Sequence, residues 1–197
     1  MAITSGHQVV CCDRNRRGGL KAIWLVEQGK IGDPGTVTAG VIASFPTEDA
    51  DGTAAPHAYK FEFDRGTAGF SANASRENGS TLITVELEFY IPKVTSEVNS
   101  RLNELATSCG IFAVVESYAD DCDAPTTYKF LLGYDSIFGK TAYMEFASGE
   151  QSTGVGLQDA NGTLVKLSGE QGEYPLEYSG TITDPTSGTV TDPYTLS

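Results

Sequence analysis

Apolar and polar residues separate most cleanly over residues 65–92, where the pattern predicts one long β-hairpin. Asn78-Gly79 is typical of a two-residue type I′ turn, because both central residues of that turn need positive φ. A turn at these two residues sets a register that makes one face of the hairpin almost entirely apolar. The apolar pairs in this register are Ala74 with Ile83, Ala72 with Val85, Phe70 with Leu87, and Ala68 with Phe89. A slip by one residue would mix the two faces, so the sequence predicts this register.

The residues after the hairpin predict one amphipathic helix. Thr95 or Ser96 can cap its amino-terminal end. Apolar residues then recur at helical spacing and form one stripe, at Val94, Val98, Leu102, Leu105 and Ala106. Glu97 and Arg101 lie one turn apart on the exposed side, and Cys109-Gly110 ends the helix. The stripe predicts that this helix packs against a sheet.

Shorter strands are predicted from apolar runs and from alternation of apolar and polar residues. They cover residues 9–12, 20–26, 37–45, 59–63, 111–115, 128–132, 143–146, 164–167 and 178–183. We expect residues 46–57 to form a long mobile loop and the glycine-broken stretch 148–156 to follow the strand at 143–146.

These elements predict a single mainly β domain over residues 1–183, an antiparallel β-sandwich or barrel with one flanking α-helix. Residues 184–197 are rich in Thr, Ser, Pro, Gly and Asp, which indicates a flexible carboxy-terminal tail.

The charge of the chain changes the range of functions to consider. Its 197 residues contain 26 acidic and 13 basic side chains, a formal net charge of −13. Such a field repels nucleic acid and anionic membranes and argues against a protein that grips DNA phosphates. High solubility is an equally good explanation. No apolar run approaches the roughly 20 residues of a membrane span, so no membrane anchor is expected.

The sequence offers no candidate catalytic residue. His7 and His57 are the only histidines, and neither stands beside a Gly-x-Ser-x-Gly nucleophile motif. The chain has no phosphate loop and no dinucleotide-binding pattern, so no cofactor is expected. Without a secretory signal pattern, the four cysteines are expected to be thiols. Cys11 and Cys12 are adjacent on a predicted strand and point to opposite faces, which disfavours a shared metal.

Two charged clusters are candidates for subunit contacts. The acidic stretch 48–51 could offer oxygen ligands to calcium, as could residues 120–123, but neither matches a calcium-binding loop, and solvated loops are favoured. The one basic cluster, at residues 14–17, is too small for a nucleic-acid footprint and can instead meet an acidic patch on a neighbouring copy or remain solvated. The candidate interface residues are Arg14, Arg16, Arg17, Glu48, Asp49 and Asp51.

The order of these elements resembles that of tail-tube proteins of tailed bacteriophages. The resemblance rests on the amino-terminal strand pair, the long hairpin, Pro92 leading into one helix, and the strand pair around Leu131-Leu-Gly-Tyr134. It continues in a glycine-rich loop before a hairpin turn and a late strand, with Ser148-Gly-Glu150, Gly154 and Asp159-x-Asn161-Gly162-x-Leu164. The chain looks most similar to small structural proteins of crAss-like phages.

The resemblance implies a virion structural protein, made in the host cytoplasm, that assembles into hexameric rings. The rings would stack into a tail tube, contact other phage tail proteins and let DNA pass during ejection. A strongly acidic lumen would keep DNA from sticking.

Three other functions remain open from the sequence. A collar or head-decoration protein would use the same kind of subunit. A carbohydrate-binding β-sandwich would use exposed aromatic residues such as Tyr118, Tyr174, Tyr178 and Tyr194. A glycosidase would need two paired carboxylates, and nothing in the sequence singles out two.

Overall fold

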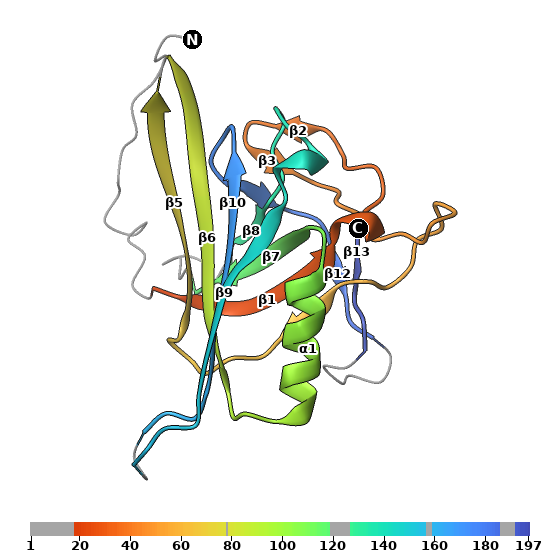
Figure 1. The fold of residues 1–197 in the computed structure, drawn as a ribbon. Helices are drawn as coiled ribbons and strands as arrows, with labels where there is room; N and C mark the ends of the chain where they lie inside the picture. The colour runs from red at the N-terminus through yellow and green to blue at the C-terminus, as the bar shows by residue number, and fades with distance from the viewer. Residues whose placement is uncertain (1–17, 78, 119–126, 157–158, 186–191) are drawn as a thin grey trace.

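The computed structural model describes residues 18–197 except 78, 119–126, 157–158 and 186–191. These residues form a mainly β structure with one α-helix, as predicted (Figure 1). The strands are β1 (Leu20–Glu27), β2 (Val37–Thr38), β3 (Val41–Ile42), β4 (Tyr59–Phe61), β5 (Ala68–Glu77), β6 (Ser80–Pro92), β7 (Ile111–Ser117), β8 (Lys129–Leu132), β9 (Met144–Ser152), β10 (Gly162–Gln171), β11 (Leu176–Tyr178), β12 (Ile182–Thr183) and β13 (Thr195–Leu196). The helix is α1 (Ser96–Thr107), and short 3₁₀ turns span Gln28–Lys30 and Lys140–Ala142.

The long hairpin forms in the predicted register. Strands β5 and β6 pair antiparallel from Ala68 opposite Phe89 to Glu77 opposite Ser80. On β6 the residues at 83, 85, 87 and 89 are at most 3% exposed, whereas Glu86 and Glu88 are exposed. The hairpin projects beyond the neighbouring strands at its turn (Figure 1). The alternation of apolar and polar residues, together with the turn residues, was therefore enough to predict the register of this hairpin.

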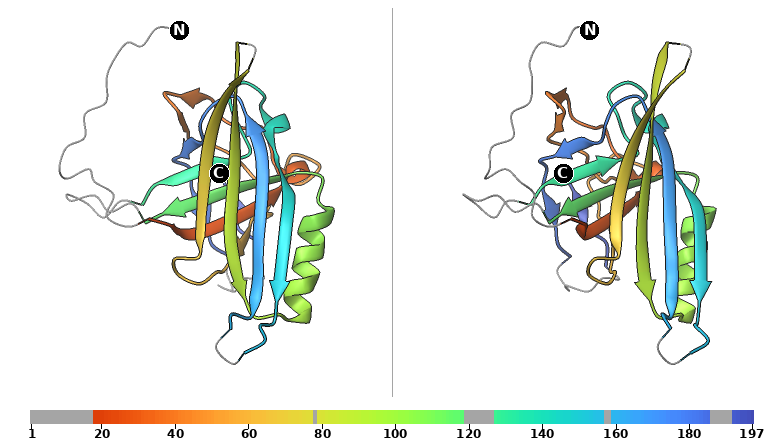
Figure 2. Two further views of the ribbon diagram at one scale, coloured as in Figure 1. Left: turned by 60° about the vertical axis from the view of Figure 1, so that its left-hand side comes forward. Right: turned by 90° about the vertical axis from the view of Figure 1, so that its left-hand side faces the viewer.

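Eleven strands of the described residues form one sheet that folds into two layers. The front layer has the strand order β5-β6-β10-β9, and Figure 2 shows these four strands side by side. The back layer contains β4, β1, β7, β8, β11, β3 and β2 and runs across behind it. The layers join where Ile111 of β7 pairs with Met144 of β9. Pairing is antiparallel except between β11 and β3, so the sheet is mixed.

The main core lies between the two layers. Strand β6 contributes Val85, Leu87 and Phe89, which are 0% exposed, and β1 contributes Ile23 and Leu25 from the opposite layer. Burying a side chain of this size stabilises the fold by about 1.5–3 kcal/mol before entropy is counted. Burial of one face of the front layer in this core leaves the opposite face of the layer exposed to solvent.

A second core covers the outer side of the back layer. Strand β7 is buried on both faces, since every residue from Ile111 to Val115 is at most 2% exposed. Its alternate residues Phe112 and Val114 pack in this second cluster with Trp24, Phe45 and other buried residues. The edge-to-face contact of Phe45 with Phe112, with ring centroids 5.3 Å apart, belongs to this core. Trp24 is thus a core residue.

Of the two predicted caps of helix α1, Thr95 is the one that forms. The Thr95 side chain accepts a hydrogen bond from the Val98 backbone N–H at 3.2 Å. Leu105 is the buried contact of the helix, whereas Ala106, placed on the apolar stripe by the sequence, is exposed. Glu97 and Arg101 are both exposed, as predicted, and Arg101 pairs with Glu104 at 3.0 Å. The apolar face is therefore narrower than the sequence pattern indicated.

Two predicted strands have different boundaries in the structure. In place of one strand over residues 37–45, residues 37–42 form the tight hairpin β2–β3, because Ala39 (φ 52°) and Gly40 (φ 81°) reverse the chain. In contrast, β9 continues through the glycine-broken stretch to Ser152. Gly149 fits there because a Cβ atom would lie 2.7 Å from Cζ of Phe146, so the ring occupies the place of a side chain.

The expectation of a flexible tail from residue 184 is wrong for the last residues. Strand β13 pairs with β12, and Leu196 is fully buried. The Tyr178 hydroxyl donates to the backbone oxygen of Ser197 at 2.9 Å. Tyr194 and Leu196 are therefore part of the second core.

Candidate functional site

The outer face of the front layer, on the side away from the main core, carries mostly polar residues; Figure 2 shows the four strands that form this face. Because side chains alternate along a strand, the register of the four strands determines which residues share this face. We call it the acidic face, and its polar residues are Ser71, Asn73, Ser75, Thr84, Glu86, Glu88, Glu145, Ser148, Glu150, Lys166, Ser168 and Glu170. Long-range pairing of β6, β9 and β10 brings these residues together.

The charges on the acidic face are strongly unbalanced. Among the side chains that the structure describes on this face, five are carboxylates and one is an ammonium group, a formal charge of −4. Lys166 Nζ lies 2.8 Å from Glu88 Oε2 on the neighbouring strand. The hydrogen bond and charge of Glu88, with the nearby charges of Glu150 and Glu86, raise the pKa of Lys166 above its ordinary value. The single cation is therefore held by acids, and the face repels anions.

A shallow hollow of about 450 Å³ surrounds this ion pair. It is bordered by Gly69, Glu86, Ala147 and Lys166, which come from the four strands of the front layer. Nothing lies within 4 Å of where a Cβ atom of Gly69 would be, so the missing side chain leaves the space open. Within the described part of the chain, no group of three or more His, Cys, Asp or Glu side chains is arranged to hold a metal ion.

The front layer has one open long edge. Among the described strands, β5 pairs only with β6. The opposite edge, at β9, lies next to α1, where Gln151 Nε2 donates to Asn99 Oδ1 at 2.7 Å. Because β5 is ten residues long and one of its edges has no partner among the described strands, that edge offers backbone N–H and C=O groups to another strand. The β5 edge is therefore available for pairing between copies.

The interface residues expected from the sequence do not lie on the acidic face. Arg14, Arg16 and Arg17 fall outside the described residues. Asp49 and Asp51 are exposed, and Glu48 is half-buried, in a loop that the structure ties down by hydrogen bonds. These three acids form a separate group beside the second core.

Loop 46–57 is anchored in ways the sequence did not indicate. Thr47 is fully buried, and its hydroxyl accepts from the Leu196 backbone N–H at 3.2 Å. His57 Nε2 lies 2.7 Å from Asp49 Oδ1 across the loop. Asp51 Oδ1 accepts from the Thr53 backbone N–H at 3.1 Å, which lowers the pKa of Asp51. His57 thus joins two parts of this loop.

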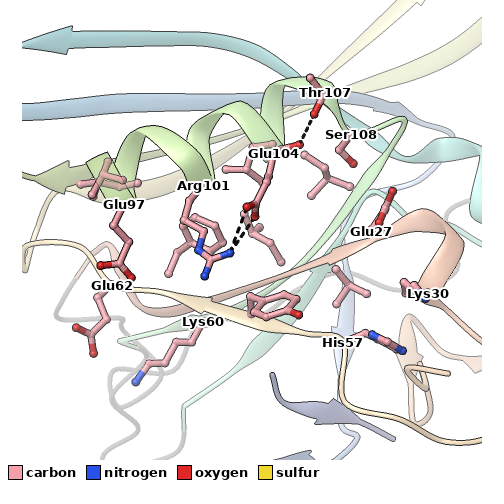
Figure 3. Close-up of a pocket in the computed structure, with 18 residues that line it drawn as sticks. Glu27, Lys30, His57, Lys60, Glu62, Glu97, Arg101, Glu104, Thr107 and Ser108 are labelled. Atoms are coloured by element: carbon pink, nitrogen blue, oxygen red, sulfur yellow. Dashed lines mark hydrogen bonds and ion pairs between the residues drawn. The ribbon is translucent and has the colours of Figure 1, made fainter. Parts of the chain in front are cut away.

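The second surface feature is a groove between α1 and β4, with a volume of about 560 Å³ (Figure 3). We call it the helix groove. Its apolar lining includes the half-buried Phe61, Ile91 and Val98. Glu97 of α1 and Glu62, which follows β4, lie at the same end of the groove (Figure 3). The groove thus combines an apolar floor with charged ends.

Two of the four tyrosines considered above for a sugar-binding surface are buried. Tyr178 and Tyr194 are 1% and 6% exposed, and burial raises the pKa of Tyr178 to about 12. Tyr118 lies under the Arg65 guanidinium at 5.7 Å from the ring centroid. Of the four tyrosines, only Tyr174, at 59%, is well exposed. Burial of two of these rings removes them from any sugar site.

An exposed apolar loop was missed by the sequence analysis. Ile137 and Phe138 are 63% and 48% exposed. The fully buried Asp135 holds this loop, because its carboxylate accepts the backbone N–H groups of Ile137, Phe138 and Gly172. The Asp-Ser sequence at 135–136 is a turn signal that could have indicated this loop, although not its contact with residue 172.

No family model, curated protein or solved structure matches the chain. None of the helices among the described residues is long and apolar enough to cross a membrane.

Proposed function

We propose that this chain is a virion structural subunit that forms rings, and that the rings stack into the tail tube of a tailed bacteriophage. The observation that carries the proposal is the front layer, which combines a solvent-exposed acidic face with an open strand edge at β5. The resemblance of the sequence to tail-tube proteins supports the same function.

In this proposal the acidic face lines the lumen of the ring. A hexamer would place the four front-layer strands of each subunit around the channel, joined through the β5 edge. A head-to-tail contact of this kind closes into a ring when its rotation divides a full turn. The two buried cores lie on the opposite side of the layer, so the lumen surface is formed without disturbing them.

The charge of the proposed lumen suits passage of DNA. Binding of a protein to DNA gains free energy when basic side chains replace condensed counterions. Each subunit presents five carboxylates and one lysine that is already paired with Glu88, so this gain is absent. Like charges also keep the duplex away from the wall. DNA would therefore slide through the tube without being retained.

Assembly of the purified chain tests the proposal. At high concentration, light scattering and negative-stain microscopy should reveal rings or tubes with a central channel. Asn73→Pro and Ala74→Pro provide a matched pair on β5, because neighbouring N–H groups of a strand point to opposite sides. The substitution that leaves the melting temperature nearly unchanged is the one on the free edge, and it should abolish ring formation.

A chain that remains monomeric at all salt and protein concentrations, also when added to preformed phage tail initiators, would contradict the proposal. Rings of a different symmetry that bind capsids and not tubes would instead identify a collar or head-decoration protein.

A further inference from the structure

The helix groove has an apolar floor that the described residues leave open to solvent. Phe61, Ile91 and Val98 line it and are only half-buried. Strand β4 is the edge of the back layer, since among the described strands it pairs only with β1. Another segment of chain can pack against these apolar side chains and pair with the edge of β4.

The charges around the groove suit a basic occupant at one end. Glu62 and Glu97 lie at that end, with Lys60 as the nearby cation (Figure 3). Arg101 is already paired with Glu104. The amino-terminal residues 1–17 contain three arginines and one aspartate, a charge of +2, whereas residues 18–197 hold the remaining −15. The amino-terminal segment is therefore the complementary occupant within this chain.

The order of residues in the segment also matches the order of features along the groove. Phe61 pairs with Ile23, so Glu62 lies toward the amino-terminal end of β1, which Gly18 precedes. Four residues of strand separate Gly18 from Ala22, about 13 Å. The chain from Arg14 to Gly18 spans up to about 14 Å, which is enough to return to Glu62. Residues 9–12 would then follow over the apolar floor.

We propose that residues 9–17 dock in the helix groove of their own chain. Val9, Val10, Cys11 and Cys12 cover the apolar floor, and Arg14, Arg16 and Arg17 lie at the end marked by Glu62 and Glu97. The docked segment shields α1 and β4 from solvent. This inference does not depend on the proposed function, because it concerns one copy of the chain.

Disulfide trapping in the full-length chain tests the proposal. In a background with Cys109→Ser and Cys122→Ser, the remaining thiols are Cys11 and Cys12. Val98→Cys places a new thiol in the groove, and Ser100→Cys places one on the exposed opposite side of the same helix. Under mild oxidation, we expect an intrachain link to Val98→Cys to form at least about tenfold faster than a link to Ser100→Cys, since effective concentration governs the rate.

The charge requirement is tested in the same assay. Glu62→Gln with Glu97→Gln should slow trapping severalfold, whereas Glu145→Gln with Glu170→Gln, the same charge change on the acidic face, should leave it unchanged. Equal trapping at residues 98 and 100, no trapping at either, or a link between two chains would overturn the proposal.

Hydrogen exchange provides a measurement that leaves the groove unaltered. Replacing Arg14, Arg16 and Arg17 with serine should increase exchange in α1 and β4, and replacing them with lysine should preserve the protection. Unchanged exchange in the serine variant would also overturn the proposal.

Discussion

Lys166 and Glu88 form an ion pair across β10 and β6, with 2.8 Å between Nζ and Oε2, in the middle of a surface that is otherwise acidic. Both side chains are nearly half exposed, so solvent and salt screen their attraction. The pair matters because Lys166, the one cation among the described side chains of the acidic face, is already bound to a carboxylate of the same face. The remaining carboxylates set the potential that an approaching polyanion meets.

Reversing charge on the acidic face should convert it into a DNA-binding surface. Glu86→Lys, Glu145→Lys and Glu170→Lys together change the face from −4 to +2 and the chain from −13 to −7. We expect binding to double-stranded DNA at about 0.05 M salt that weakens steeply as salt rises, because counterion release drives it. Electrophoretic mobility shift and fluorescence anisotropy measure it.

A control variant has the same net charge, but its three substitutions lie outside the acidic face. Asp33→Lys, Asp51→Lys and Asp184→Lys also give −7 and alter exposed residues away from the front layer. This variant and the natural chain should show no DNA binding under the same conditions. Equal binding by both triple variants would mean that net charge, and not the acidic face, controls the interaction.

Two glycines of the front layer should respond oppositely to alanine. At Gly162 a Cβ atom would collide with the Ile91 carbonyl oxygen and with the Tyr90 ring, whereas at Gly69 nothing lies within 4 Å of the Cβ position. Gly162→Ala should lower the free energy of unfolding by about 1–3 kcal/mol through overpacking. Gly69→Ala should leave it unchanged or raise it by up to about 1 kcal/mol, because the unfolded chain loses entropy. Urea denaturation compares the two, and similar losses would contradict this account.

The hairpin could be predicted from sequence because its information is local. The Asn78-Gly79 sequence signal and the alternation on both sides of it predict the register that β5 and β6 adopt, without reference to the rest of the chain. The cap at Thr95 was predictable for the same reason. The hairpin register and the helix cap were predictable because a few neighbouring residues determine each of them.

The acidic face could not be predicted, because it depends on pairing between distant strands. Glu88 and Lys166 meet only when β10 pairs with β6. The burial of Leu196 likewise depends on β12 and on Thr47, far away in the chain. The composition of residues 184–197 resembles a disordered tail, and only tertiary contacts overrule it. Such contacts also explain why loop 46–57 is anchored.

Removing Lys21 should reduce stability in a pH-dependent way. Burial raises the pKa of Glu116, but hydrogen bonds from Lys21 (at 2.8 Å) and Thr127 and the Lys21 charge outweigh it, so the pKa lies below its ordinary 4.5. A lowered carboxyl pKa contributes stability that is present above about pH 4.5 and lost as the pH falls through the folded-state pKa. Lys21→Met should therefore cost up to about 1 kcal/mol at pH 7, since solvent partly screens the pair, and much less at pH 3.

Denaturant titrations at the two pH values measure this difference. Lys60→Met, on the adjacent strand β4, removes a lysine opposite Trp24 and serves as the control. It should show no comparable loss at pH 7. A loss in Lys21→Met that is equally large at pH 3 would show that packing of the lysine stem, and not its charge, is responsible.

The carboxy-terminal residues should prove essential to the second core. Leu196 is fully buried in a cluster with Trp24, Phe45 and Tyr178. Leu196→Ala should lower the free energy of unfolding by about 2–5 kcal/mol, because it removes buried methyl groups and leaves a cavity. Ser197→Ala, at the exposed neighbouring residue, should change it by less than about 0.5 kcal/mol. Thermal and urea unfolding measure both variants. If Leu196→Ala left the free energy of unfolding unchanged, the carboxy-terminal residues would not be part of the core.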